Sequence, residues 1–127
     1  MDATEGSNGF PGRFKQALQK TESTRSAEHV ATLFAGGARL TNLGGDHGQD
    51  AQTFWQIYLE QFRDIRSEFT GETVSNSSAA LEWVSRGTLA DGRPVEYRGI
   101  SVIDFDREAV TAFRTYYDSA AFVRSKS

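Results

Sequence analysis

Two ionisable side chains of this chain are placed where they could exchange a proton near neutral pH. His47 lies in the glycine-rich segment 44–48, beside Asp46, and histidine titrates close to neutrality. Asp118 ends the segment Tyr116-Tyr117-Asp118 and is the second candidate for a catalytic acid or base. Each also has a purely structural explanation: an exposed loop histidine beside a helix cap, and an aspartate that caps a terminal helical turn.

The composition excludes most other chemistry. The 127 residues include no cysteine, so disulfides, thiolate zinc sites and cysteine nucleophiles are ruled out. With only two histidines, we expect neither a metal site nor a cofactor. The net charge is −3 and the basic residues are scattered singly, which argues against nucleic-acid binding. No apolar run has membrane-spanning length and residues 1–12 lack a signal-peptide segment, so we expect a cytoplasmic protein that binds no membrane.

Apolar residues recur with helical spacing in the first half of the chain. The first two predicted helices begin after Pro11 and at Ser26, and the second should end at Gly36-Gly37. The clearest helix is predicted over 50–63. Its broad apolar face consists of Ala51, Phe54, Trp55, Tyr58, Leu59 and Phe62.

From Ile65 onward the apolar period changes to two, which predicts strands. The predicted strands cover 65–75, 79–90, 94–105 and 109–117, preceded by a short strand at 38–43. Short turns between the last four strands favour antiparallel pairing. The sequence therefore predicts an α+β fold with one domain over 10–123, a flexible tail at 1–9 and a C-terminal tail at 124–127.

Alternation along the strands separates two faces of the predicted sheet. The face expected to pack on the helices is mostly large and apolar, with a few hydroxyls: Ile65, Phe69, Leu81, Trp83, Ser85, Tyr97, Gly99, Ser101, Ile103, Phe113, Thr115 and Tyr117. The other face mixes charges with Ile100, Val102, Val110 and Tyr116. We expect this outer face to form a homodimer interface; an ordinary solvated face is the alternative.

Three stretches of the sequence resemble the SnoaL-like branch of the nuclear transport factor 2-like superfamily. They are LFAGGARLTN at 33–42, LEW at 81–83, and GISVIDFD at 99–106 followed by FRTYYD at 113–118. The resemblance covers residues 10–123 and implies a cone-shaped fold, in which a curved sheet wraps the long helix around a deep apolar cavity. Proteins of this fold include ketosteroid isomerases, polyketide cyclases, epoxide hydrolases and dehydratases, and also members without catalysis.

The resemblance also indicates which of these reactions to exclude. Ketosteroid isomerases use a carboxylate base, a tyrosine and a protonated acid, whose positions correspond here to Asn42, Leu18 and Ser101. Limonene-type epoxide hydrolases use an Asp-Arg-Asp arrangement, whose positions correspond to Trp83, Ser85 and Thr115. The acids of both enzyme classes are therefore absent.

Aromatic walls with a few polar groups are typical of a small-molecule site, although the rings could also simply fill the core. The residues predicted to bind a ligand are Asn42, Trp55, Tyr58, Trp83, Ser85, Tyr97, Ser101, Phe113, Thr115 and Tyr117. We expect this pocket to bind a small, largely apolar molecule, and any catalysis to be an acid–base cyclisation, dehydration or isomerisation, or a hydrolysis, with Asp118 or His47 moving the proton. The alternative is a non-catalytic ligand-binding or dimerisation module.

Overall fold

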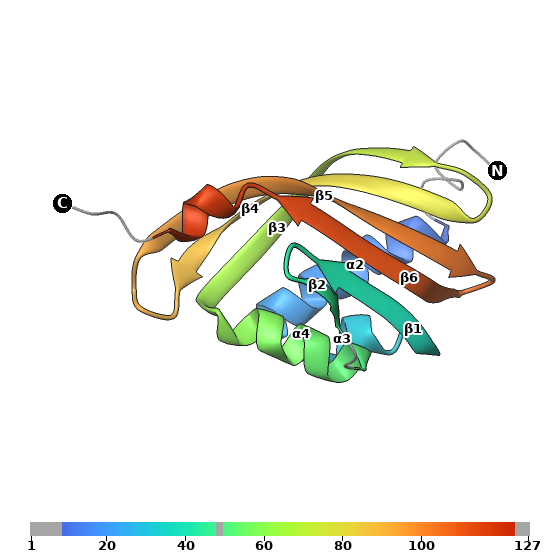
Figure 1. Ribbon diagram of the computed structural model, residues 1–127, viewed down its shortest axis with the longest axis horizontal. Helices are drawn as coiled ribbons and strands as arrows, with labels where there is room; N and C mark the ends of the chain where they lie inside the picture. The colour runs from blue at the N-terminus through green and yellow to red at the C-terminus, as the bar shows by residue number, and fades with distance from the viewer. Residues whose placement is uncertain (1–8, 48–49, 124–127) are drawn as a thin grey trace.

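Three helices lie on one side of a curved six-stranded sheet (Figure 1). The computed structural model describes residues 9–47 and 50–123, with only the backbone of Asp46 and His47, so the tail predictions for 1–8 and 124–127 lie outside the described residues. The helices are α2 (Phe10–Thr24), α3 (Glu28–Ala31) and α4 (Ala51–Glu60), and the 3-10 helix η1 covers Ser119–Phe122. The strands are β1 (Phe34–Asn42), β2 (Gly45–His47), β3 (Phe62–Val74), β4 (Ser78–Leu89), β5 (Pro94–Asp106) and β6 (Ala109–Tyr117).

Helix α2 begins with proline in its first turn, where a missing N–H costs nothing, and buries Phe14 and Leu18 against the sheet. It ends at Thr24, and its C-cap residue Arg25 has a left-handed backbone at φ 64°. The Arg25 guanidinium donates to the carbonyl oxygens of Leu59 and Phe62, at 3.1 and 2.8 Å. These bonds satisfy carbonyl groups where α4 gives way to β3, and so attach the end of α2 to that junction.

Helix α4 is the long amphipathic helix that the sequence predicts. Asp50 caps its start, because its side chain accepts a hydrogen bond from the Thr53 backbone N–H at 2.8 Å. Phe54, Trp55 and Leu59 are buried. The helix ends at Glu60, earlier than predicted, and the buried Phe62 already belongs to β3.

The sheet has the order β2-β1-β6-β5-β4-β3. The antiparallel pairing predicted for the last four strands is confirmed, while β1 adds a parallel pairing with β6. The prediction that Gly36-Gly37 ends a helix is wrong, because α3 stops at Ala31 and both glycines lie within β1. The register with β6 is irregular between Phe34 and Arg39, and Gly37 at φ 81° supplies the positive dihedral of this bulge. A short strand, β2, also occupies part of the predicted loop at 44–48.

The predicted inner face of the sheet carries the core: Ile65, Leu81, Trp83, Tyr97, Ile103 and Phe113 are all buried. Val110 was expected on the outer face, and this expectation is wrong, since its side chain is 0% exposed. The register shifts between Asp104 and Phe105, so that Phe105 pairs with Val110 and the alternation changes phase there.

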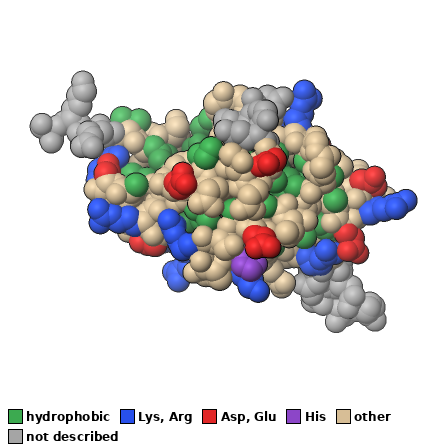
Figure 2. Space-filling model, turned by 90° about the horizontal axis from the view of Figure 1, so that it is seen from below, with side chains coloured by type: hydrophobic (Ala, Val, Ile, Leu, Met, Phe, Trp, Pro, Cys, Tyr) green, Lys and Arg blue, Asp and Glu red, His purple; other side chains and the backbone are tan. Residues whose placement is uncertain are grey.

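Charged side chains do not gather on the face shown in Figure 2, where acidic and basic groups are interspersed. Among the described residues, no helix has the length and apolar character needed to cross a bilayer.

Gly99 lets β5 approach the ring of Trp83 closely. A Cβ at this position would lie 2.7 Å from Trp83 Cζ2 and 2.8 Å from Tyr117 Cβ, and would also collide with the Tyr116 carbonyl oxygen. We predict that Gly99→Ala lowers the free energy of unfolding by about 2 kcal/mol, as overpacking in a core does. Urea denaturation measures this change. Gly36→Ala, where no atom lies within 4 Å, is the control, and equal effects of the two substitutions would contradict the prediction.

Candidate functional site

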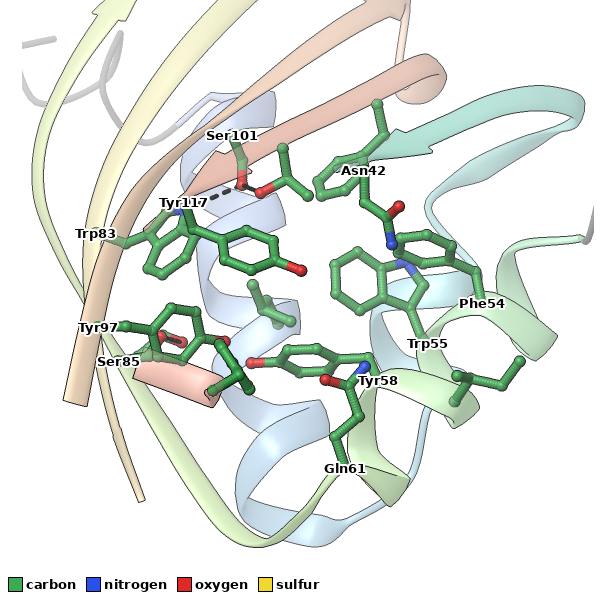
Figure 3. Close-up of a pocket in the computed structure, with 16 residues that line it drawn as sticks. Asn42, Phe54, Trp55, Tyr58, Gln61, Trp83, Ser85, Tyr97, Ser101 and Tyr117 are labelled. Carbon is green, nitrogen blue, oxygen red and sulfur yellow. Dashed lines mark hydrogen bonds between the residues drawn. The ribbon is translucent and has the colours of Figure 1, made fainter. Parts of the chain in front are cut away.

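A cavity of about 190 Å³ lies between α2, α4 and the inner face of the sheet (Figure 3). All the residues predicted to bind a ligand line it: Asn42, Trp55, Tyr58, Trp83, Ser85, Tyr97, Ser101, Phe113, Thr115 and Tyr117. Leu18, Phe54, Ile57, Gln61, Ser67 and Phe122 complete the lining. Ile57 and Gln61, near the carboxyl end of α4, are exposed residues of this lining.

Aromatic rings form the walls but do not fill the space between the helix and the sheet. They meet edge to face: the centroids of Trp55 and Tyr58 lie 5.3 Å apart, and those of Trp83 and Tyr97 lie 5.2 Å apart. Tyr117 continues the second wall, 5.5 Å from Tyr97, and its hydroxyl points into the cavity (Figure 3). Such rigid, interlocked rings support one another and leave room at their centre.

One polar chain crosses the sheet wall of the cavity. The indole N–H of Trp83 donates to Ser101 Oγ at 2.9 Å, and Ser101 Oγ lies 2.9 Å from Thr115 Oγ1. This chain fixes the Trp83 ring against the wall. Asn42 lies across the cavity, where its Oδ1 accepts from the backbone N–H of Gly44 at 2.8 Å and so stabilises the turn after β1.

A second polar chain ends at a buried acid that the sequence analysis missed. Glu22 of α2 is 3% exposed. Its Oε1 accepts from the Ser67 backbone N–H at 2.8 Å, and its Oε2 accepts from Ser67 Oγ at 2.6 Å and from the Tyr58 hydroxyl at 2.7 Å. Ser67 Oγ also lies 2.6 Å from Ser85 Oγ. Glu22 thus reaches the cavity through three lining residues without lining it itself.

Burial dominates the electrostatics of this group. Desolvation raises the pKa of Glu22 above its ordinary value, although the hydrogen bonds from Ser67 and Tyr58 act in the opposite direction. Desolvation and the neighbouring Glu22 charge also raise the pKa of Tyr58 well above the ordinary tyrosine value. The pKa of Tyr97 is raised mainly by burial, so both phenols remain protonated at neutral pH.

The signals for Glu22 and Ser67 were present in the sequence. Glu22 follows Leu18 by four residues and so continues the buried stripe of α2, and Ser67 lies between Ile65 and Phe69 on the inward side of β3. A charged side chain on an apolar stripe requires partners, and it is the feature that would have pointed to this site.

Of the two proposed proton-transfer residues, Asp118 is not part of the cavity lining. Asp118 is exposed and caps η1, because its Oδ1 accepts from the Ala120 backbone N–H at 3.0 Å. His47 pairs with Leu40 through the backbone of β2, and its side chain lies outside the described part of the structure. Their catalytic role stays a prediction. Within the described residues, no three acidic or histidine side chains gather as a metal site requires.

Glu22 should make the stability of the chain depend on pH. Its folded pKa is above the ordinary 4.5, so its contribution to stability is complete below pH 4.5 and is lost as the pH rises through the folded value. We predict that Glu22→Gln loses less stability than the wild type between acidic and neutral pH. Urea denaturation across this range measures the difference, and parallel curves for the two proteins would contradict it.

The family assignment agrees with this geometry. The SnoaL-like domain model matches residues 14–113. Among solved structures, the chain resembles a nuclear transport factor 2-like protein from Anabaena variabilis, with 13% identity, TM-score 0.83 and coverage of 95% of this chain and 96% of that chain. A putative isomerase from Rhodopseudomonas palustris has 21% identity, TM-score 0.73 and coverages of 86% and 89%.

A protein from Catenulispora acidiphila with a ketosteroid isomerase-like fold, in complex with trimethylamine, has 15% identity, TM-score 0.73 and coverages of 85% and 87%. No curated protein sequence matches the chain. At these identities the solved structures establish the fold alone. The match of the domain model across most of the chain shows that this protein belongs to the SnoaL-like domain family.

Proposed function

We propose that the chain binds a small, largely apolar molecule in the cavity beneath its curved sheet. The observation that carries this proposal is the cavity itself: about 190 Å³ remains between aromatic walls that also carry hydroxyl groups. Apolar walls with a few orienting polar groups are the usual composition of small-molecule sites. The trimethylamine complex of the Catenulispora acidiphila protein provides an example of small-molecule binding within this fold.

Acid–base catalysis on the bound molecule is the second candidate function, and the buried Glu22 favours it. A cyclisation, dehydration or isomerisation needs an acid or base that exchanges a proton with the substrate. Glu22 is connected to the cavity through Tyr58, Ser67 and Ser85. Asp118 and His47 are the alternative groups for this step, and a non-catalytic binding module is the alternative to catalysis.

Intrinsic fluorescence should report ligand binding directly. Both tryptophans of the chain, Trp55 and Trp83, line the cavity. We predict that indane, an apolar bicyclic hydrocarbon, changes their emission saturably, because it enters the space between the rings. Leu18→Phe should weaken this binding, since Leu18 lines the cavity and a larger side chain occupies part of it.

Leu43→Phe is the matched control, because Leu43 is 48% exposed and lies outside the cavity lining. Native mass spectrometry provides an independent readout of bound ligand. The proposal fails if indane neither alters the emission nor is retained, or if Leu18→Phe and Leu43→Phe bind it equally well.

We also propose that the outer face of the sheet forms a homodimer interface. Val84, Ile100 and Val102 are half-buried on this face, and Tyr116 beside Ile100 is 47% exposed. The aliphatic patch is flanked by ion pairs such as Arg114–Asp104 at 2.8 Å. An apolar centre with charged surroundings suits contact with a second copy.

A cytoplasmic location remains a proposal that rests on the sequence alone.

The dimer is tested by placing a charge on this face. We predict that Tyr116→Glu shifts the protein from dimer to monomer in size-exclusion chromatography with light scattering, because two carboxylates would be buried at a symmetric contact. Leu43→Glu, at an equally exposed hydrophobic residue elsewhere, should remain dimeric. A wild type that is monomeric at high protein concentration would contradict the interface.

A further inference from the structure

Glu22 is a buried carboxyl without a cationic partner among the described residues: its polar contacts are Ser67 and Tyr58, and no ion pair links it to Lys, Arg or His. A carboxylate has only acceptor sites. When Glu22 is ionised, Ser67 and Tyr58 must therefore each donate their single hydroxyl proton to it. In any further hydrogen bond, these two hydroxyl groups can therefore act only as acceptors.

The same constraint sets the donor in the next hydrogen bond toward the cavity. Because the Ser67 proton is committed to Glu22, the 2.6 Å contact between Ser67 and Ser85 requires Ser85 to be the donor. Ser85 lines the cavity, and with its proton used in this chain it presents only lone pairs to a ligand.

We propose that Glu22 makes Ser85 a hydrogen-bond acceptor at this end of the cavity, and that the chain recognises an apolar molecule carrying a hydroxyl group that donates to Ser85. This inference rests on the proposed function, because it requires the ligand to occupy the cavity. An aromatic body fits the ring-lined walls. A hydroxyl fits the acceptor end, whereas a carbonyl or ether oxygen at that end would face lone pairs and leave the chain unsatisfied.

A hydroxyl suits this end better than an ammonium group does. Glu22 does not line the cavity, and the hydroxyls of Ser67 and Tyr58 stand between its carboxylate and the ligand. A buried ammonium would lose its hydration without gaining a direct ion pair, and the desolvation free energy of a charged group is large. The desolvation free energy of a neutral hydroxyl group is much smaller.

Glu22→Gln should invert this preference. The backbone N–H of Ser67 keeps the amide oxygen at the Oε1 position, so the amide nitrogen takes the Oε2 position and donates to Ser67 and Tyr58. The proton of Ser67 is then released toward Ser85, whose own proton turns into the cavity. Ser85 thereby becomes a donor that matches a carbonyl.

The experiment measures dissociation constants for four probes with one carbon skeleton: indane, indanol, indanone and the protonated amine of indane. At a mildly alkaline pH, which favours the carboxylate form of Glu22, the wild type should bind indanol about tenfold tighter than indanone, the size of one well-made hydrogen bond. Glu22→Gln should bind indanone tighter than indanol. Ser85→Ala should reduce the preference of the wild type, and the outward-facing Glu82→Gln should retain it.

Each outcome has a distinct meaning. Equal binding of indanol and indanone by the wild type, or tighter binding of indanone, overturns the inference while the cavity remains a binding site. Tightest binding of the amine overturns the assignment of a hydroxyl. Failure of all four probes, indane included, removes the proposed function itself. Circular dichroism and thermal melting establish that the variants are folded, and the wild-type comparison of indanol with indanone decides the question even where a variant is not.

Discussion

The buried carboxyl group of Glu22 connects the elements that surround the cavity. It comes from α2, and it accepts hydrogen bonds from Tyr58 on α4 and from Ser67 on β3. A carboxyl group removed from water must find such partners, because the loss of hydration is otherwise uncompensated. The two helices and the sheet can therefore meet only in an arrangement that brings these groups together. Arg25 supports the same arrangement from the end of α2, through the carbonyls of Leu59 and Phe62.

The cavity follows from this arrangement and from the size of the side chains around it. Large aromatic rings separate helix α4 from the sheet. The ring centroids of Trp55 and Phe113, for example, lie 5.2 Å apart in an edge-on contact, and such rings do not interdigitate as aliphatic chains do. The sheet wall is stiffened by the Trp83–Ser101–Thr115 chain. The result is a preorganised space with hydroxyl groups at one end, which suits the recognition of an apolar molecule better than a flexible surface does.

The sequence predicts the fold and the cavity lining because both depend on periodicity. Two-residue alternation placed Trp83 and Ser101 on one face, and helical spacing placed Trp55 and Tyr58 on another. The bulges were beyond this reasoning, since a one-residue slip such as that before Phe105 is decided by tertiary packing. Glu22 was missed for a related reason: it continues the apolar stripe of α2, but its partners lie 36 and 45 residues away in the chain. The proton-transfer candidates His47 and Asp118 were chosen by residue type alone.

The central claim is that hydrogen-bonded hydroxyl groups couple the ionisation of Glu22 to ligand binding. The pKa of Glu22 in the ligand-bound protein tests this claim most directly. NMR of the side-chain carboxyl carbons, assigned by the signal lost in Glu22→Gln, measures that pKa in the free protein and with indanol or indanone bound. Indanol should lower it, because a donor at the cavity end stabilises the chains directed toward the carboxylate, and indanone should raise it. The same pKa in all three states would contradict the account.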